Sequence, residues 1–242
     1  MNKAQFEKSL INLAKENKYF LSENQFQIAL AIELANVERG NGHEGACAYL
    51  DQKKNVMSEE RKEKTISPDI VITKEKFIGD VYRDGEELVY VECKYVVCGK
   101  FVEDKSVVRQ SSAKKPGMPG VRYNFWCDVE RMEKVDPAAG AKKYVILLTN
   151  DERCWTSGLT NQGSSDRELG FHNDRGDMTR NMIYYTSSKG KPVNKTITLK
   201  GSYRLEKDAW KLYQDDVTKA AVVEMPMEKR DPDFRYLLLE VK

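Results

Sequence analysis

The sequence predicts an α/β protein in which helices flank a mixed β-sheet. Residues 69–73 and 87–97 are rich in β-branched and aromatic side chains, as adjacent strands are. Residues 142–150, KKYVILLTN, form an apolar run short enough to be a fully buried strand. The segment before this run, RYNFWCDVERMEKV, carries apolar residues at helical spacing. A helix followed by a buried strand is typical of α/β folds.

Two helices are predicted at the start of the chain. In residues 3–17 the apolar side chains recur at the spacing of a helix that buries one stripe. A second helix is predicted over residues 23–38, because Ser22 is a candidate N-cap and Gln25, three residues later, would complete a capping box. Residues 46–50, ACAYL, then predict a short strand.

The Asp84-Gly85 dipeptide is a hairpin-type turn signal between the first two predicted strands. Beyond residue 150 turn-forming residues dominate, and the end of the chain carries the strand-like runs TITLK, AAVVEM and FRYLLLEV. We therefore expect a single domain with a core over residues 1–150. Residues 151–242 are expected to be a β-rich C-terminal extension of that domain, to which no function is assigned.

Composition excludes several classes of protein. The chain of 242 residues is 40% hydrophobic and 32% charged, and it has no uncharged apolar run near the roughly 20 residues that cross a bilayer. Its start lacks the apolar block of a signal peptide. Five cysteines without CxxC spacing and two histidines fit neither a zinc site nor a disulfide framework. We expect a cytoplasmic protein with no membrane partner; the net charge of +2 neither requires nor excludes a polyanion.

Two charged residues interrupt the strand predicted over residues 87–97. Because successive side chains of a strand point to opposite faces, Glu92 and Lys94 share one face and their apolar neighbours share the other. Burying both charges is unfavourable unless each finds a metal ion, an opposite charge or a phosphate. Asp69, at the start of the neighbouring strand, supplies a second carboxylate. Two carboxylates and a lysine suit phosphodiester hydrolysis with Mg²⁺, which one or two carboxylates and a substrate phosphate can hold.

The order and spacing of these residues are similar to those of a known family. Pro68-Asp69, twenty-two intervening residues and then Glu92-Cys93-Lys94 resemble the motif of the PD-(D/E)xK nuclease superfamily, which includes restriction endonucleases. The resemblance implies a restriction-endonuclease-like core and a metal-dependent deoxyribonuclease that uses Mg²⁺, with Mn²⁺ as a substitute. It implies that Asp69 and Glu92 bind the metal and that Lys94 assists the attacking water. A role in restriction or phage defence is a further expectation of the family, as is a homodimer for cutters of both strands.

Many members of this superfamily carry another acid on the helix before the aspartate strand. Glu33 lies seven residues after Phe26 and falls on the apolar stripe of the predicted helix. We therefore assign Glu33 as a further metal-binding and catalytic residue. Glu23 is the competing candidate, although its place near the helix start is explained by the helix dipole alone.

A basic segment follows the motif. Its cations could contact DNA phosphates and give salt-dependent binding, or they could belong to a solvated loop. They are Lys100, Lys105, Arg109, Lys114, Lys115 and Arg122. In the helix that follows, Asp128 and Arg131 are expected to pair at i, i+3 on an exposed face.

The main alternative function is a non-catalytic module on the same fold that binds nucleic acid or protein. In that case Glu92 and Lys94 would form a structural salt bridge. The sequence does not decide among duplex, branched and single-stranded substrates.

Overall fold

The computed structural model describes the chain except residues 18, 53, 58–62, 79–80, 98–100, 104–105, 109–117, 138–139, 156–181, 189–190, 204, 206–208 and 214–232. Within this part, three α-helices and a six-stranded mixed sheet confirm the predicted α/β class. The helices are α1 (Lys3–Glu16), α2 (Glu23–Gly40) and α3 (Met118–Glu133). No helix among the described residues has both the length and the apolar composition needed to cross a bilayer.

The central sheet has the strand order β1-β4-β5-β8-β12-β11. Its strands are β1 (Ala46–Leu50), β4 (Ile70–Ile78), β5 (Val81–Val96), β8 (Lys142–Thr149), β11 (Trp210–Leu212) and β12 (Arg235–Val241). β5 and β8 are parallel, whereas the other neighbouring pairs are antiparallel. The parallel pair needs a crossover, which contains α3. The last strand of the chain pairs with β8, so the C-terminal segment contributes to the same sheet.

Three further strand pairs lie outside the central sheet. They are β2 (Lys54–Met57) with β3 (Glu63–Ile66), β6 (Phe101–Glu103) with β7 (Ser106–Val108), and β9 (Met182–Ser188) with β10 (Lys191–Ile197). A single 3₁₀ turn, η1 (Glu152–Cys154), follows β8. Of the predicted C-terminal strands, FRYLLLEV corresponds to β12, and TITLK contributes only its first two residues to β10. AAVVEM lies outside the described residues.

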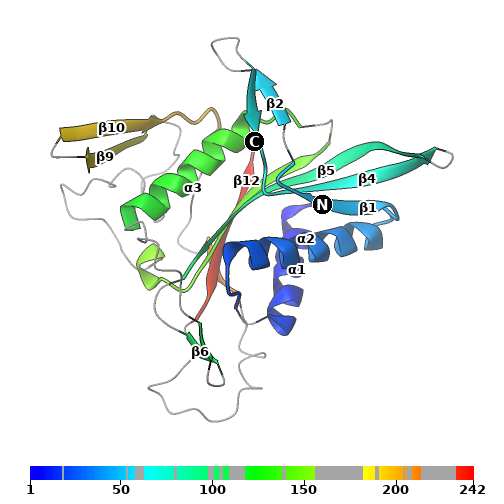
Figure 1. The fold of residues 1–242 in the computed structure, drawn as a ribbon, viewed down its shortest axis with the longest axis horizontal. Coiled ribbons are helices and arrows are strands. Elements are labelled where there is room, and N and C mark those ends of the chain that lie inside the picture. The colour runs from blue at the N-terminus through cyan, green and yellow to red at the C-terminus, as the bar shows by residue number, and fades with distance from the viewer. Residues whose placement is uncertain are drawn as a thin grey trace.

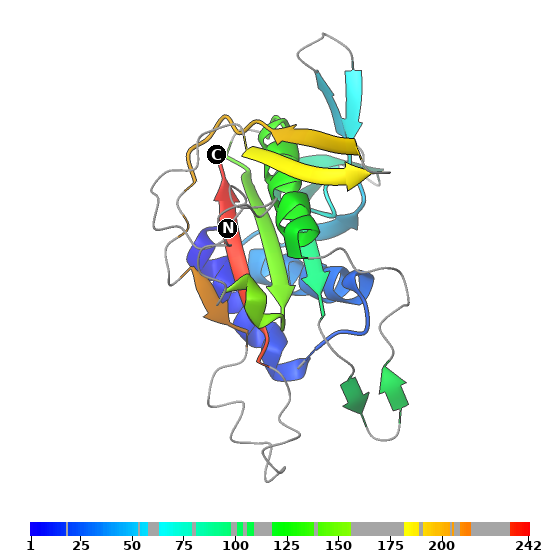
Figure 2. The same cartoon turned by 90° about the vertical axis from the view of Figure 1, so that its left-hand side faces the viewer.

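Helices cover both faces of the sheet (Figure 1). α1 and α2 lie on one face, where Phe6 and Leu30 pack in one apolar cluster with Val91 of β5. α3 lies on the other face, where Trp126 packs in a second cluster with Tyr90 of β5. Figure 2 shows β8 and β12 running side by side between these two helical layers. The sheet therefore separates two cores, and β5 contributes side chains to both.

The predicted N-terminal helices are confirmed. α2 begins after Ser22, whose hydroxyl accepts a hydrogen bond from the Gln25 backbone N–H at 3.1 Å. The predicted capping box is wrong in one detail, because the Gln25 side chain accepts from the backbone N–H of Leu21 at 2.6 Å. That bond fixes the chain one residue earlier than a capping box would.

The predicted hairpin forms, but its turn is elsewhere. Pairing of β4 with β5 continues to Ile78↔Val81, so Asp84-Gly85 lies within the paired part of β5. The register shifts between Lys74 and Lys76, opposite this dipeptide. A Cβ atom on Gly85 would overlap the backbone carbonyl of Lys74. The glycine is therefore explained by close backbone approach at an irregularity rather than by a turn.

Candidate active site

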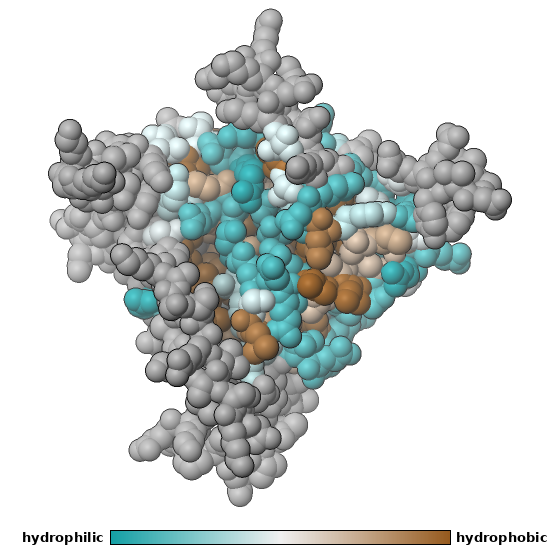
Figure 3. Space-filling model, in the orientation of Figure 1, coloured by the Kyte–Doolittle hydropathy of each residue, from teal (hydrophilic) through white to brown (hydrophobic). Residues whose placement is uncertain are grey.

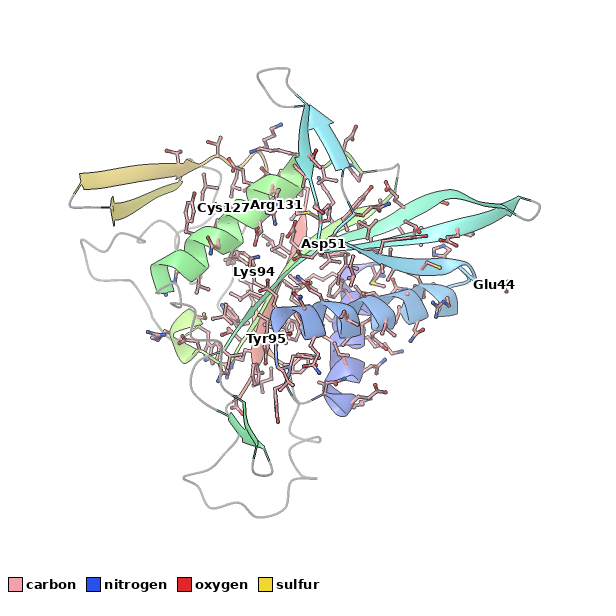
Figure 4. All side chains as sticks on the ribbon, viewed as in Figure 1. Glu44, Asp51, Lys94, Tyr95, Cys127 and Arg131 are labelled. Atoms are coloured by element: carbon pink, nitrogen blue, oxygen red, sulfur yellow. The ribbon has the colours of Figure 1, made fainter. Side chains whose placement is uncertain are left out.

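Strand β5 carries its charged residues on the face covered by α3. Val91 and Cys93 belong to the apolar cluster on the α1/α2 side, whereas Tyr90 belongs to the cluster on the α3 side. Glu92 is 0% exposed, and its carboxylate bonds to α3. The alternation predicted from the sequence is confirmed, and Figure 4 shows Lys94 on the α3 side as well.

Asp69 lies next to Glu92 through strand pairing. The pairing of β4 with β5 ends at Ile70↔Val91, so Asp69 stands directly before the paired part of β4, and its charge acts on Glu92. Oδ2 of Asp69 accepts a hydrogen bond from the Cys93 backbone N–H at 2.7 Å. This bond holds the aspartate at the position where β4 begins. The bond explains why an aspartate precedes the apolar strand in residues 67–72, SPDIVI: Asp69 links the start of β4 to β5.

Helix α3 completes a set of ion pairs over the charged face. Arg131 contacts both oxygens of Glu92, Nε to Oε1 at 3.1 Å and Nη2 to Oε2 at 2.5 Å. The same Nη2 lies 3.0 Å from Oδ1 of Asp128, and Nζ of Lys94 lies 3.2 Å from Oδ2 of Asp128. The predicted Asp128–Arg131 pair is confirmed, but the exposed face is wrong, because Asp128 is only 4% exposed.

The acid that α2 contributes is Glu23. Its Oε2 accepts a hydrogen bond from the Tyr95 backbone N–H at 2.9 Å, one residue from Lys94. Glu33 instead faces α1, where Oε1 accepts from Nδ2 of Asn12 at 3.0 Å. The assignment of Glu33 as the inward acid is therefore not supported by its contacts. The fully buried acid of α2 is Glu38, which lies 2.6 Å from Nδ1 of His43.

We call the assembled group the β5 charge cluster. Its members, linked by these contacts and by their mutual electrostatic effects, are Asp69, Glu92, Asp128, Glu23, Lys94 and Arg131. When all four acids are ionised, four carboxylates against two cations leave a formal excess of two negative charges. Such an excess, close to a buried strand, attracts a divalent cation.

The cluster changes the proton affinity of its members. Burial, reinforced by the charge of Asp69, raises the pKa of Glu92 to about 8 despite the opposing effect of Arg131. Burial likewise raises the pKa of Asp128 against the effects of Lys94 and Arg131. Burial lowers the pKa of Lys94, but Asp128, Glu23 and Asp69 outweigh that effect and hold it above its ordinary value. Lys94 is therefore a permanent cation that donates hydrogen bonds.

The cluster supplies the ligands that Mg²⁺ prefers. Within the described ranges, no group of three or more His, Cys, Asp or Glu side chains is arranged to hold a metal ion by itself. Mg²⁺ does not require such a group, since it usually keeps several waters and binds one or two carboxylates together with substrate phosphates. The neighbouring carboxylates of Asp69 and Glu92 fit that requirement.

The predicted phosphate-binding cations divide into two groups. Arg122 lies inside α3 rather than in a loop; it is 2% exposed, and its Nη2 donates to the carbonyl oxygen of Arg153 at 3.1 Å. Its assignment to an exposed arm is wrong, because its side chain is buried and bonds to the backbone of η1. The remaining five cations lie outside the residues whose side chains the structure describes: Lys100, Lys105, Arg109, Lys114 and Lys115.

The surface above the cluster is polar. Figure 3 shows hydrophilic residues through the middle of the face seen in Figure 1, with apolar residues beside them. Arg131 is 41% exposed, so this member of the cluster is in contact with solvent.

Comparisons of the chain with protein-family models, curated proteins and solved structures each gave no match.

Proposed function

We propose that this protein is a metal-dependent nuclease that hydrolyses DNA phosphodiester bonds with Mg²⁺ or Mn²⁺. The observation that carries the proposal is the convergence of Asp69, Glu92 and Lys94 on one face of the sheet, at the pairing of β4 with β5. A PD-(D/E)xK nuclease requires this arrangement. A restriction-endonuclease-like core is part of the proposal, supported by the mixed sheet with helices on both faces.

The chain's own residues would divide the chemistry among them. Asp69 and Glu92 hold the divalent ion, which when bound polarises the phosphate and acidifies a water molecule. Lys94 stays protonated, so it orients the attacking water or stabilises the negative charge that develops on the phosphate, and does not accept a proton. Asp128 fixes the lysine in place through its 3.2 Å contact.

The proposed location is the cytoplasm. The cysteines that the structure describes are free thiols, namely Cys47, Cys93, Cys127 and Cys154. Free thiols are typical of a reducing compartment. A homodimer for double-strand cutting and a role in restriction or phage defence belong to the same proposal and rest on the resemblance alone.

A cleavage assay tests the activity. Plasmid, linear duplex and single-stranded DNA are incubated with the purified protein in Mg²⁺, Mn²⁺ or a chelator, and cutting is expected only with metal. Lys94→Ala should slow cutting by roughly 100-fold or more, the effect of removing one transition-state donor. Lys142→Ala is the matched control, because Lys142 is 47% exposed and pairs at 2.8 Å with Glu240 on the surface. Undiminished cutting by folded Lys94→Ala would remove this lysine from the mechanism.

The alternative function is a binding module without catalysis. One observation favours it: Arg131 already pairs with both oxygens of Glu92, so the carboxylate has a cation partner without any metal. Calorimetric titration of Mg²⁺ separates the two functions. A nuclease should bind Mg²⁺ and lose that binding in Asp69→Ala, whereas a binding module should retain DNA without metal and without cutting.

A further inference from the structure

Arg131 is hydrogen-bonded to Glu92, the carboxylate that the proposed mechanism assigns to metal binding. Its Nε and Nη2 engage both oxygens of Glu92, at 3.1 and 2.5 Å, and Nη2 also reaches Asp128 at 3.0 Å. A paired, bidentate contact of this kind is the strongest form of arginine–carboxylate interaction. A metal ion that binds Glu92 would therefore share the carboxylate with a guanidinium that already engages both of its oxygens.

We infer that Arg131 is an exchangeable partner of Glu92: it pairs with this carboxyl group when metal is absent and moves to a substrate phosphate when metal binds. The inference rests on the proposed function and adds to it a substrate-contacting residue on α3. Sequence spacing alone did not indicate this role, because the pair with Asp128 was expected on the exposed face of the helix.

Three features of the site support the exchange. A divalent ion beside Glu92 would stand within a few ångströms of a guanidinium, and like charges at that distance repel. Arg131 is 41% exposed, whereas Glu92 is 0% exposed, so the arginine is the partner that can swing outward. The guanidinium fork that fits a carboxylate also fits a phosphate bidentately.

Asp128 can hold Arg131 in the site while the arginine leaves Glu92. It stays in contact with Lys94 at 3.2 Å, so one carboxylate of α3 remains paired when Arg131 leaves Glu92. Arg131 and Asp128 lie three residues apart on α3, which lets the arginine keep one contact while it exchanges the other. The arginine would then reach toward the polar surface of Figure 3 rather than detach from the site.

The inference predicts opposite effects on metal and on DNA. Replacing Arg131 removes a competitor for Glu92, so Arg131→Met should bind Mn²⁺ about tenfold more tightly in a calorimetric titration, the effect of losing one charge-assisted contact. The same variant should bind duplex DNA more weakly, with the slope of log affinity against log salt reduced by about one phosphate contact. A residue that only stabilised the fold would not produce both changes.

Two further variants make the experiment decisive. Arg153→Met is the matched control, since the exposed Arg153 pairs at 2.6 Å with the buried Asp151 rather than with a member of the β5 charge cluster and should leave Mn²⁺ affinity unchanged. If Arg131→Met fails to fold by circular dichroism, Arg131→Lys replaces it; a single ammonium cannot hold both oxygens of Glu92, so Mn²⁺ affinity should still rise.

The outcomes separate the two proposals. Unchanged or weakened Mn²⁺ binding in folded Arg131 variants, with wild type that binds Mn²⁺ and cuts DNA, overturns the exchange and leaves the nuclease proposal standing. Retention of the full salt slope by Arg131→Met overturns the phosphate contact. A wild-type protein that binds no Mn²⁺ and cuts no DNA overturns the proposed function, and the exchange with it.

Discussion

Replacing Glu92 with glutamine should change how stability depends on pH when metal is removed by a chelator. The pKa of this carboxyl is about 8 in the folded protein, against an ordinary value of 4.5. Between these two values the folded state keeps a proton that the unfolded chain has released. Stability conferred on the fold by that proton is present at the acidic end of the window and is lost as the pH rises toward 8.

The size of the effect follows from linkage. One bound proton contributes a slope of at most about 1.4 kcal/mol per pH unit, so between about pH 5.5 and 7.5 the upper limit is about 3 kcal/mol. Coupling to Asp69 and Arg131 spreads the titration, and we expect a loss of about 2 kcal/mol in wild type that is absent in Glu92→Gln. Urea unfolding at several pH values measures the difference.

A matched acid-to-amide change provides the control. Glu33→Gln alters a carboxylate of α2 that bonds to Asn12 on the opposite side of the sheet, and it should retain the wild-type slope. Parallel pH profiles for wild type and Glu92→Gln would refute the conclusion that Glu92 is desolvated beside Asp69. With Mn²⁺ at roughly 100 times its dissociation constant, wild type should gain about 2.7 kcal/mol, and Glu92→Gln should gain much less.

Two predictions concern the scaffold that holds the site. Gly85→Ala places a methyl group on the Lys74 carbonyl, so thermal unfolding should show a destabilisation of about 1–3 kcal/mol, and an unchanged melting temperature would contradict the close approach. The Tyr95 hydroxyl donates to the carbonyl of Phe20 at 2.8 Å and accepts from its N–H at 3.0 Å; Tyr95→Phe should therefore cost about 1–3 kcal/mol in urea unfolding, and a neutral result would mean that water replaces the hydroxyl.

The arrangement of β5 could be predicted from the sequence because it depends on a local rule. Alternation along a strand is set by the backbone, so the placement of Glu92 and Lys94 opposite Val91 and Cys93 follows from position alone. The pairing with β4 was equally accessible, since the intervening residues are too few for anything but a hairpin-like return. The turn was predicted at Asp84-Gly85, which was wrong because glycine occurs both in turns and where two backbone segments approach closely.

The partners on α3 and α2 depended on packing that the sequence does not specify. Asp128 lies three residues after Phe125, which is on the buried stripe of the helix. Helical spacing could therefore have been used to predict that Asp128 is buried. Glu33 was misassigned because α2 contacts both the sheet and α1. The apolar stripe of the helix predicts that Glu33 points toward the protein interior, but not whether it contacts the sheet or α1. Glu23 reaches the site from the first turn of α2. In the sequence, the helix dipole alone was sufficient to explain an acidic residue at that position.

The energetics of the β5 charge cluster explain little of the stability of the fold. Buried ion pairs stabilise little, and replacing them with apolar residues is often neutral or favourable by about 1–4 kcal/mol. Here many of the neighbouring side chains on this sheet face belong to an apolar cluster, so stability alone would be served by an apolar residue at position 92. Burial and the charge of Asp69 nevertheless raise the pKa of Glu92 against the opposing effect of Arg131, so an acid at this position is costly to keep ionised.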